Sequence, residues 1–254
     1  MLFDKFLPKR KKYKTKEDEN QRIAKVSYMN AMNIALTWLN QNPKELTRKD
    51  QIMLLDYLID SILNDACASA VARQIYAIPD EIKGQTKSPL PVTYTDENGN
   101  TQFIVTGKKV SVDLSAARVY VRPWKYDLTP KKLRVKTRKD FERNLSFQNS
   151  YFFTDIKLCC VCEGNHGVNA GRYFKTGIIT STECDLTELY QNIDTDGYMW
   201  ENKYTGKKEK MPDFRFAVIY ELARVRHCIR NLSGSGIAKV RWRKEHGKFQ
   251  IIVS

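Results

Sequence analysis

Apolar residues in the first third of the chain recur at steps of three and four positions, in two segments that Asn40–Pro43 separates. This spacing places apolar side chains on one face of an α-helix. Thr47 precedes the second segment and is a suitable N-cap, with Asp50 three positions further on, as in a capping box. The pattern therefore predicts an antiparallel pair of helices over residues 17–77.

The pattern changes after a linker at about 80–91, where apolar and polar residues begin to alternate. Runs of β-branched residues flank Asn98-Gly99, which predicts a β-hairpin because glycine tolerates the positive φ of a tight turn. A short helix is expected at 185–193, and Gly164–Gly171 is interpreted as a turn between strands. Further strands are expected at 117–126, 151–162, 172–180 and 197–204.

The C-terminal pattern predicts a helix followed by a hairpin. Asp213 is a suitable N-cap for a helix over 214–232, whose apolar residues share one arc. Alternation then predicts two strands, 237–243 and 248–253. We therefore expect an α+β fold: an N-terminal helical hairpin, then a mostly antiparallel β-rich body with a C-terminal helix and β-hairpin. Its expected parts are a basic flexible arm at 1–16, the helical hairpin at 17–84, and a basic α+β domain at 85–254.

Positive charge is concentrated in three segments, although the formal net charge of the whole chain is +14. Residues 1–16, 118–143 and 222–254 together contain 25 of the 43 lysines and arginines but only 5 of the 29 acidic residues. The rest of the chain is acidic, with 18 basic and 24 acidic residues. Such segregation indicates surfaces that bind polyanions.

The basic segments supply candidate nucleic-acid-binding residues. In 118–126 basic and aromatic residues alternate, and single-strand binders use such residues to hold phosphates and stack on bases. We expect the basic side chains to contact phosphates and the aromatic rings to stack on bases. The alternatives are a packed aromatic stripe and charged strands that prevent edge-to-edge aggregation. The candidates are Lys9, Arg10, Lys11, Lys12, Arg118, Tyr120, Arg122, Trp124, Tyr126, Lys131, Lys132, Arg134, Lys136, Arg226, Arg230, Lys239, Arg241, Arg243 and Lys248.

The chain has six cysteines, three of them within 159–162. Cys160, Cys162, His166 and Cys184 are the candidate zinc ligands, because tetrahedral zinc sites are built from thiolates and imidazoles. No second closely spaced pair completes the pattern, so small buried thiols in a core strand are the simpler interpretation, and we expect no cofactor. Free thiols and the lack of a secretory signal favour a reducing location: the cytoplasm, a host cell or a virion. No apolar run is long enough to form a transmembrane segment.

No enzyme signature is recognisable. Gly164–Gly171 lacks the Lys-Ser/Thr of a P-loop, and the acidic residues between 183 and 201 lack the spacing of restriction-type nucleases. We therefore expect a non-enzymatic protein that binds nucleic acid, with a metal-dependent nuclease as a weaker alternative. The residues do not distinguish DNA from RNA, and they leave the oligomeric state open.

A second interpretation is a structural or assembly protein of a virus particle. The stretch Leu54–Ile75, followed by the predicted hairpin turn at 96–100, resembles the front end of bacteriophage portal proteins, without a diagnostic motif. This resemblance implies a phage head or connector component. Its basic faces would then contact packaged genome or acidic neighbouring subunits.

Overall fold

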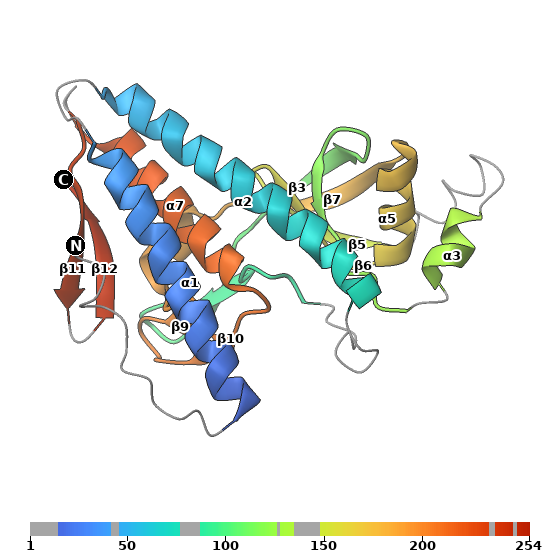
Figure 1. Ribbon diagram of the computed structural model, residues 1–254, viewed down its shortest axis with the longest axis horizontal. Coiled ribbons are helices and arrows are strands. Elements are labelled where there is room, and N and C mark those ends of the chain that lie inside the picture. Colours follow the sequence, from blue (N-terminus) through green and yellow to red (C-terminus); the bar gives the residue numbers. More distant parts are fainter. Residues whose placement is uncertain are drawn as a thin grey trace. The chain divides into compact units, whose positions relative to one another are not determined.

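The computed structural model describes residues 15–41, 46–76, 87–125, 128–134, 148–233, 237–245 and 248–254, apart from the side chains of 242–252. The chain folds into two compact units: unit 1 comprises the residues up to 58 together with 193–254, and unit 2 comprises 59–192. Helices occur together with a mixed sheet, which confirms the predicted α+β class (Figure 1). The predicted arm at 1–16 lies almost entirely outside the described residues.

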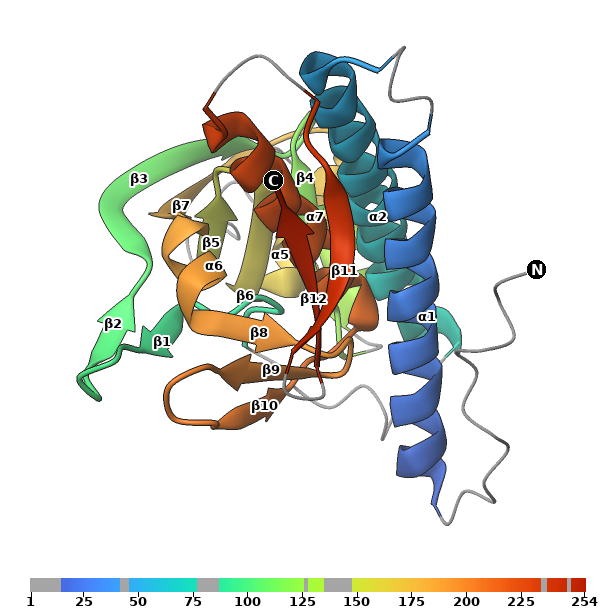
Figure 2. The same cartoon turned by 90° about the vertical axis from the view of Figure 1, so that its left-hand side faces the viewer.

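Unit 1 contains the predicted C-terminal helix and hairpin, both of which are confirmed. Helix α7 packs against α1, and β11 lies beside α1 (Figure 2). The strands form a sheet of order β10-β9-β8 and a separate β11-β12 pair, both antiparallel. The described elements are α1 (Lys16–Leu39), the first part of α2 (Arg48–Tyr76), β8 (Ile193–Thr195), β9 (Met199–Asn202), β10 (Lys208–Lys210), α7 (Phe214–Asn231), β11 (Val240–Glu245) and β12 (Lys248–Val253).

Side-chain oxygens fix the starts of the helices, as the sequence predicts. The hydroxyl of Thr47 accepts a hydrogen bond from the backbone N–H of Asp50 at 3.2 Å, and the Asp50 carboxylate accepts one from the Thr47 N–H at 2.8 Å. Asp213 accepts a hydrogen bond from the N–H of Arg215 at 3.0 Å and begins α7 in the same way. Among the described helices, none has the length and apolar character that crossing a membrane requires.

The turn between β8 and β9 approaches α1 so closely that only glycine fits. Gly197 has a φ of +87°, and a β-carbon at this position would lie 2.5 Å from the Cβ of Tyr28. Tyr28 itself is buried, and this burial raises the pKa of its phenol well above the usual value. The close approach fixes the β8–β9 turn against α1 within unit 1.

Unit 2 is built around a five-stranded mixed sheet of order β3-β7-β5-β6-β4. Two of its strand pairs are antiparallel (β3–β7 and β5–β6) and two are parallel (β5–β7 and β4–β6). The described elements are the rest of α2, β1 (Thr93–Thr95), β2 (Thr101–Phe103), β3 (Val105–Asp113), β4 (Arg118–Tyr120), α3 (Leu128–Leu133), β5 (Asn149–Phe153), β6 (Leu158–Glu163), α5 (Asn165–Phe174), β7 (Ile178–Cys184) and α6 (Thr187–Asn192).

The segment interpreted as a turn, Gly164–Gly171, is helical, and this prediction was wrong. Helix α5 begins at Asn165 and continues to Phe174, so the predicted strand 172–180 begins only at Ile178. Each glycine inside a helix costs about 1 kcal/mol relative to alanine, so the sequence pattern did not indicate a helix here. Here burial of Val168 and Ala170 in the core of the sheet outweighs that penalty.

Other local predictions hold with changed boundaries. The Asn98-Gly99 hairpin is confirmed as β1 and β2, and Gly99 has a φ of +82°. The single strand predicted over 151–162 is two antiparallel strands, β5 and β6, joined by a turn that ends at Lys157. Lys157 has a φ of 52°, a backbone conformation that residues other than glycine and asparagine rarely adopt. Buried residues lie on both sides of the turn, so the sequence pattern resembles that of one continuous strand.

Candidate anion-binding pocket

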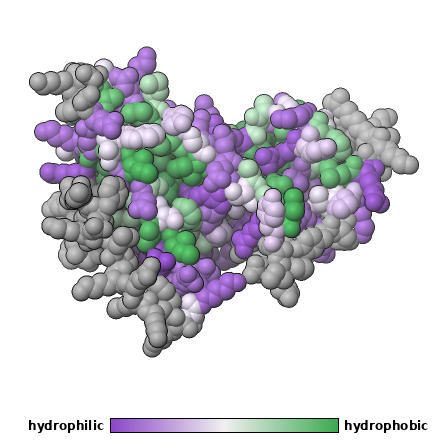
Figure 3. Space-filling view, in the orientation of Figure 1, coloured by the Kyte–Doolittle hydropathy of each residue, from purple (hydrophilic) through white to green (hydrophobic). Residues whose placement is uncertain are grey.

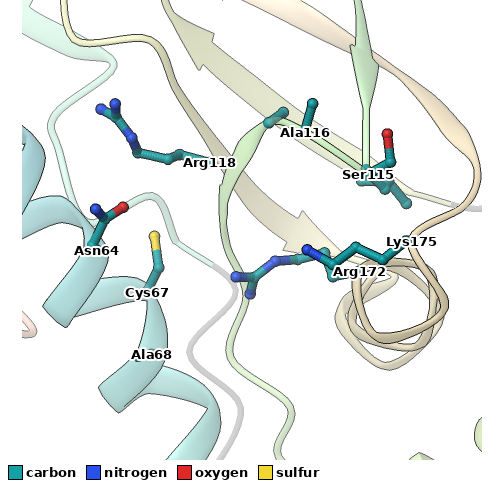
Figure 4. Close-up of a pocket in the computed structure, with 10 residues that line it drawn as sticks. Asn64, Cys67, Ala68, Ser115, Ala116, Arg118, Arg172 and Lys175 are labelled. Carbon is teal, nitrogen blue, oxygen red and sulfur yellow. The ribbon is translucent and has the colours of Figure 1, made fainter.

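A pocket of about 270 Å³ lies within unit 2, between α2, the turn that follows β3, and the end of α5 (Figure 4). Three of the side chains that line it are basic, and none of the acidic side chains that the structure describes lines it. The lining residues are Asn64, Cys67, Ala68, Leu114, Ser115, Ala116, Ala117, Arg118, Arg172 and Lys175.

The last turn of α5 supplies two of the basic side chains. Arg172 and Lys175 are three positions apart, a spacing that places both on one face of a helix. Figure 4 shows both side chains extending from α5 toward the α2 wall of the pocket. Lys175 ends the helix in the left-handed conformation, with a φ of 54°. The N–H of the next residue, Thr176, donates to the carbonyl of Gly171 at 3.0 Å, so the helix end is well defined.

The three basic residues differ in how their charge is compensated. Arg118 forms an ion pair with Asp60 of α2, with 2.6 Å between Nη1 and the carboxylate oxygen. The side chains of Arg172 and Lys175 form no hydrogen bond and no ion pair with any described residue. The pocket therefore has two positive charges that no neighbouring carboxylate neutralises, and it will attract an anion.

The turn opposite α5 is rigid, and its backbone donors are already used. The Asp113 carboxylate accepts the N–H of Ser115 at 2.9 Å, and this hydrogen bond lowers the pKa of Asp113. The Asp113 carbonyl accepts the N–H groups of Ala116 at 3.3 Å and Ala117 at 2.9 Å. The Ser115 hydroxyl also donates to the Asp113 carboxylate, so the donors that hold a ligand must come from the α2 and α5 sides of the pocket.

Of the candidates in 118–126, the structure places only Arg118 at the pocket. The ring of Tyr120 is 4% exposed, so it cannot stack on a base, and that prediction was wrong. The burial follows from the position of β4, which pairs with β6 over the core of the sheet. Arg122 donates to the carbonyl of Lys87, and Trp124 stays partly exposed. Tyr126 lies outside the described residues.

The predicted basic ridge after this segment has a different conformation. Lys131 and Lys132 lie on the short helix α3, and Arg134 follows its end, so these residues do not alternate along a strand. All three are exposed or half-buried, and none of them lines the pocket. Lys136 lies outside the described residues.

In unit 1 the predicted cationic face is only partly available. Arg226 is 4% exposed and forms an ion pair with Asp56, so the predicted phosphate contact of this side chain is excluded. Arg230 reaches the same carboxylate at 3.8 Å. Lys239 and Arg241 are exposed near the start of β11. The N-terminal candidates Lys9, Arg10, Lys11 and Lys12 and the side chains of Arg243 and Lys248 lie outside the described part of the chain.

The cysteine and histidine candidates do not form a metal site. Among the described residues, no three His, Cys, Asp or Glu side chains are close enough together to hold a metal ion. Cys160, Cys162 and Cys184 are buried in β6 and β7. Burial raises the pKa of Cys162 to about 11 and that of Cys184 to about 12, so both stay protonated at neutral pH. The zinc alternative finds no support in this arrangement.

His166 has a structural role instead. Its Nε2 accepts the backbone N–H groups of Trp124 at 3.4 Å and Lys125 at 3.3 Å. Its Nδ1 lies 2.9 Å from the hydroxyl of Thr129, which itself donates to the side-chain oxygen of Gln74 at 3.1 Å. We therefore assign the proton to Nδ1, which donates to Thr129. Both ring nitrogens are occupied, so His166 is not placed to act as a general base.

Sequence reasoning missed the two residues that define the pocket. In Arg172-Tyr-Phe-Lys175 two basic residues flank two aromatic residues, and this was the signal that the sequence contained. The segment was interpreted as part of a strand over 172–180, which hid the shared helix face of the two cations. The approach of α2 to this face depends on tertiary packing, which no local pattern reveals.

Comparison with known proteins places the chain in a family but gives no activity. No curated protein and no solved structure matches it. A family described as a family of unknown function, DUF6710, matches residues 7–231. The matched range includes all of unit 2 and every residue that lines the pocket. The chain therefore belongs to the DUF6710 family.

Proposed function

We propose that this protein binds nucleic acid without catalysing a reaction, and that the pocket of unit 2 holds a backbone phosphate. The observation that supports the proposal is the pair Arg172 and Lys175, which face one pocket without a carboxylate partner. A phosphate supplies the missing negative charge. Its oxygens accept hydrogen bonds from guanidinium and ammonium groups, the strongest donors available in proteins.

One neutral donor of the pocket suits the same ligand. The Asn64 amide lies on the α2 wall, across from Arg172 and Lys175, so a phosphate in the pocket has donors on two sides (Figure 4). A volume of about 270 Å³ admits a phosphate with part of its sugar but no folded protein segment. The ligand therefore enters by one group while the rest of the polymer stays outside.

Several basic residues of the described chain are paired with carboxylates within the fold, unlike Arg172 and Lys175. In unit 1 the side chain of Lys25 is 2.7 Å from Asp196, and Lys210 is 2.5 Å from Glu17. Such cations are neutralised within the fold and contribute little to long-range attraction. The uncompensated charge of Arg172 and Lys175, together with the excess of basic residues in the chain, favours a polyanion over a small neutral ligand.

The test is equilibrium binding to single- and double-stranded DNA and RNA across a salt series. We expect the double variant Arg172→Ala/Lys175→Ala to weaken binding at low salt about tenfold or more, because two charged contacts are lost. The slope of log K against log salt should fall by about 0.7 to 0.9 for each phosphate contact removed.

The matched control is Lys108→Ala/Lys157→Ala, which removes two exposed lysines of unit 2 that do not line the pocket. It should change the affinity much less than the pocket variant. Circular dichroism and thermal unfolding check that both variants stay folded. Equal affinities for the pocket variant, the control and the unaltered protein would overturn the proposal.

A further inference from the structure

The last turn of α5 exposes aromatic rings beside the two pocket cations. Tyr173 is 72% exposed, and Phe174, the next residue, is 41% exposed. Their ring centroids are 5.3 Å apart at an interplanar angle of 73°, an edge-to-face arrangement. Ile178, the first residue of β7, is also exposed, at 67%. In Figure 3 hydrophobic and hydrophilic surface lie side by side in the part of the molecule that contains α5.

The Tyr173 ring has no evident role in folding. Helix α5 is attached to the sheet through Val168 and Ala170, which are buried in the core of the sheet. The Tyr173 hydroxyl forms no hydrogen bond with a described residue, and the described aromatic ring beside it is that of Phe174. A ring this exposed beside two cations without a carboxylate partner is available to a ligand that those cations hold.

We propose that Tyr173 stacks on an unpaired base next to the phosphate held by Arg172 and Lys175, so that the ligand is single-stranded nucleic acid. This inference rests on the proposed function and names its substrate class. Arg172 and Tyr173 are adjacent residues of α5, and their side chains leave the helix about 100° apart. A strand that runs across the helix end can therefore present a phosphate to Arg172 in the pocket and a base to Tyr173 at its edge. Bases in a duplex stack on each other and leave no face free for the ring, whereas single strands expose every base.

Phe174 holds this platform in place. The edge-to-face contact limits the orientations of the Tyr173 ring before the ligand arrives, which lowers the entropy lost on stacking. Stacking alone discriminates little between bases, because every base has a π face. We therefore expect a preference for single strands without a strong preference for sequence.

The test compares a single-stranded DNA oligomer, an abasic strand with the same number of phosphates, and a blunt-ended duplex, by fluorescence anisotropy at one salt concentration. We expect Tyr173→Leu to weaken binding to the base-containing strand by about fivefold to a hundredfold, as loss of one stacked base does. Binding of Tyr173→Leu to the abasic strand and to the duplex should equal that of the unaltered protein. Tyr173→Phe keeps the ring and should restore the lost affinity.

The matched control is Tyr76→Leu, which removes an equally exposed tyrosine of unit 2 outside the pocket and should leave all three affinities unchanged. The inference is overturned if Tyr173→Leu binds all three ligands as the unaltered protein does while Arg172→Ala/Lys175→Ala still weakens binding. That result would leave the proposed function intact. If the arginine and lysine variant has no effect on any of the ligands, the proposed function itself fails.

Discussion

Glu221 accepts two hydrogen bonds from Arg224, which lies three positions further along α7, at 3.0 Å from Nε and 2.6 Å from Nη2. Glu221 is 2% exposed, and burial raises the pKa of its carboxyl group, although the positive charge of Arg224 opposes this effect. A second carboxylate, that of Asp194, lies 3.8 Å from Nη1 of the same guanidinium. Unit 1 thus contains a buried ion pair in which each of the two charges, on Glu221 and Arg224, compensates the other.

Replacing Glu221 with leucine should destabilise unit 1 by about 3–5 kcal/mol, because the charge of Arg224 then stays buried beside only a distant partner. The loss is measured as the change in the free energy of urea unfolding. The exposed pair of Lys210 and Glu17 is the comparison, and Lys210→Ala should cost less than about 1 kcal/mol. Equal losses for the two variants would contradict the role assigned to the buried pair.

Gln51 joins three segments of unit 1, and its loss should also be costly. Its side-chain nitrogen donates to the carbonyls of Leu39 at 3.0 Å and Ala238 at 2.8 Å, and its oxygen accepts the N–H of Ala238 at 3.0 Å. Gln51→Leu leaves three buried backbone groups without partners, at about 1 kcal/mol or more each. We expect hydrogen exchange at the Ala238 amide to accelerate. Unchanged protection of that amide would exclude this role of Gln51.

The parts of the fold that the sequence predicts are those with local signals. Thr47 with Asp50 marks the start of a helix, and Asn98-Gly99 marks a hairpin, because both signals lie within a few residues. The pairing of Arg226 with Asp56 joins residues 170 positions apart. Charge patterns along a strand or helix therefore overestimate the free positive charge, since the carboxylates that neutralise it come from distant segments.

The position of the proposed pocket could not be predicted from the sequence. The proposed pocket, like the predicted site, has basic residues next to aromatic ones, yet the segment 118–126 contributes only Arg118 to it. Burial of Tyr120 follows from its place in the sheet, and the exposure of Tyr173 follows from the end of α5. Both depend on which face tertiary packing covers. The resemblance of 54–75 to phage portal proteins stays a prediction that the fold does not address.

Substitutions at Lys175 and Lys157 separate an effect on folding stability from an effect on ligand binding. Both have a positive φ, 54° and 52°, which costs a residue with a side chain about 1 kcal/mol. Lys175→Gly and Lys157→Gly should therefore each stabilise unit 2 by about 0.5–1 kcal/mol in denaturant unfolding. Only Lys175→Gly removes a pocket charge and should weaken binding to nucleic acid. If both variants bind as the unaltered protein does, Lys175 is not a ligand contact.

The buried thiols of unit 2 should make its stability depend on pH above neutrality. An unfolded thiol loses its proton from about pH 8.5, whereas burial raises the pKa of Cys162 to about 11 and that of Cys184 to about 12. Between these values the unfolded state binds fewer protons than the folded state, so stability falls as pH rises. Each thiol contributes a slope of up to about 1.4 kcal/mol per pH unit.

The measurement is the free energy of urea unfolding from pH 6 to pH 11, for the unaltered protein and for Cys162→Ala/Cys184→Ala. The variant starts from a lower stability because it lacks buried sulfur atoms, but it should lose less stability between pH 9 and pH 11. Between pH 6 and pH 8 the two curves should run parallel, since both states keep these thiol protons there. Parallel curves over the whole range would show that the two thiols have the same pKa in the folded and unfolded states. That result would contradict the effect of burial in β6 and β7.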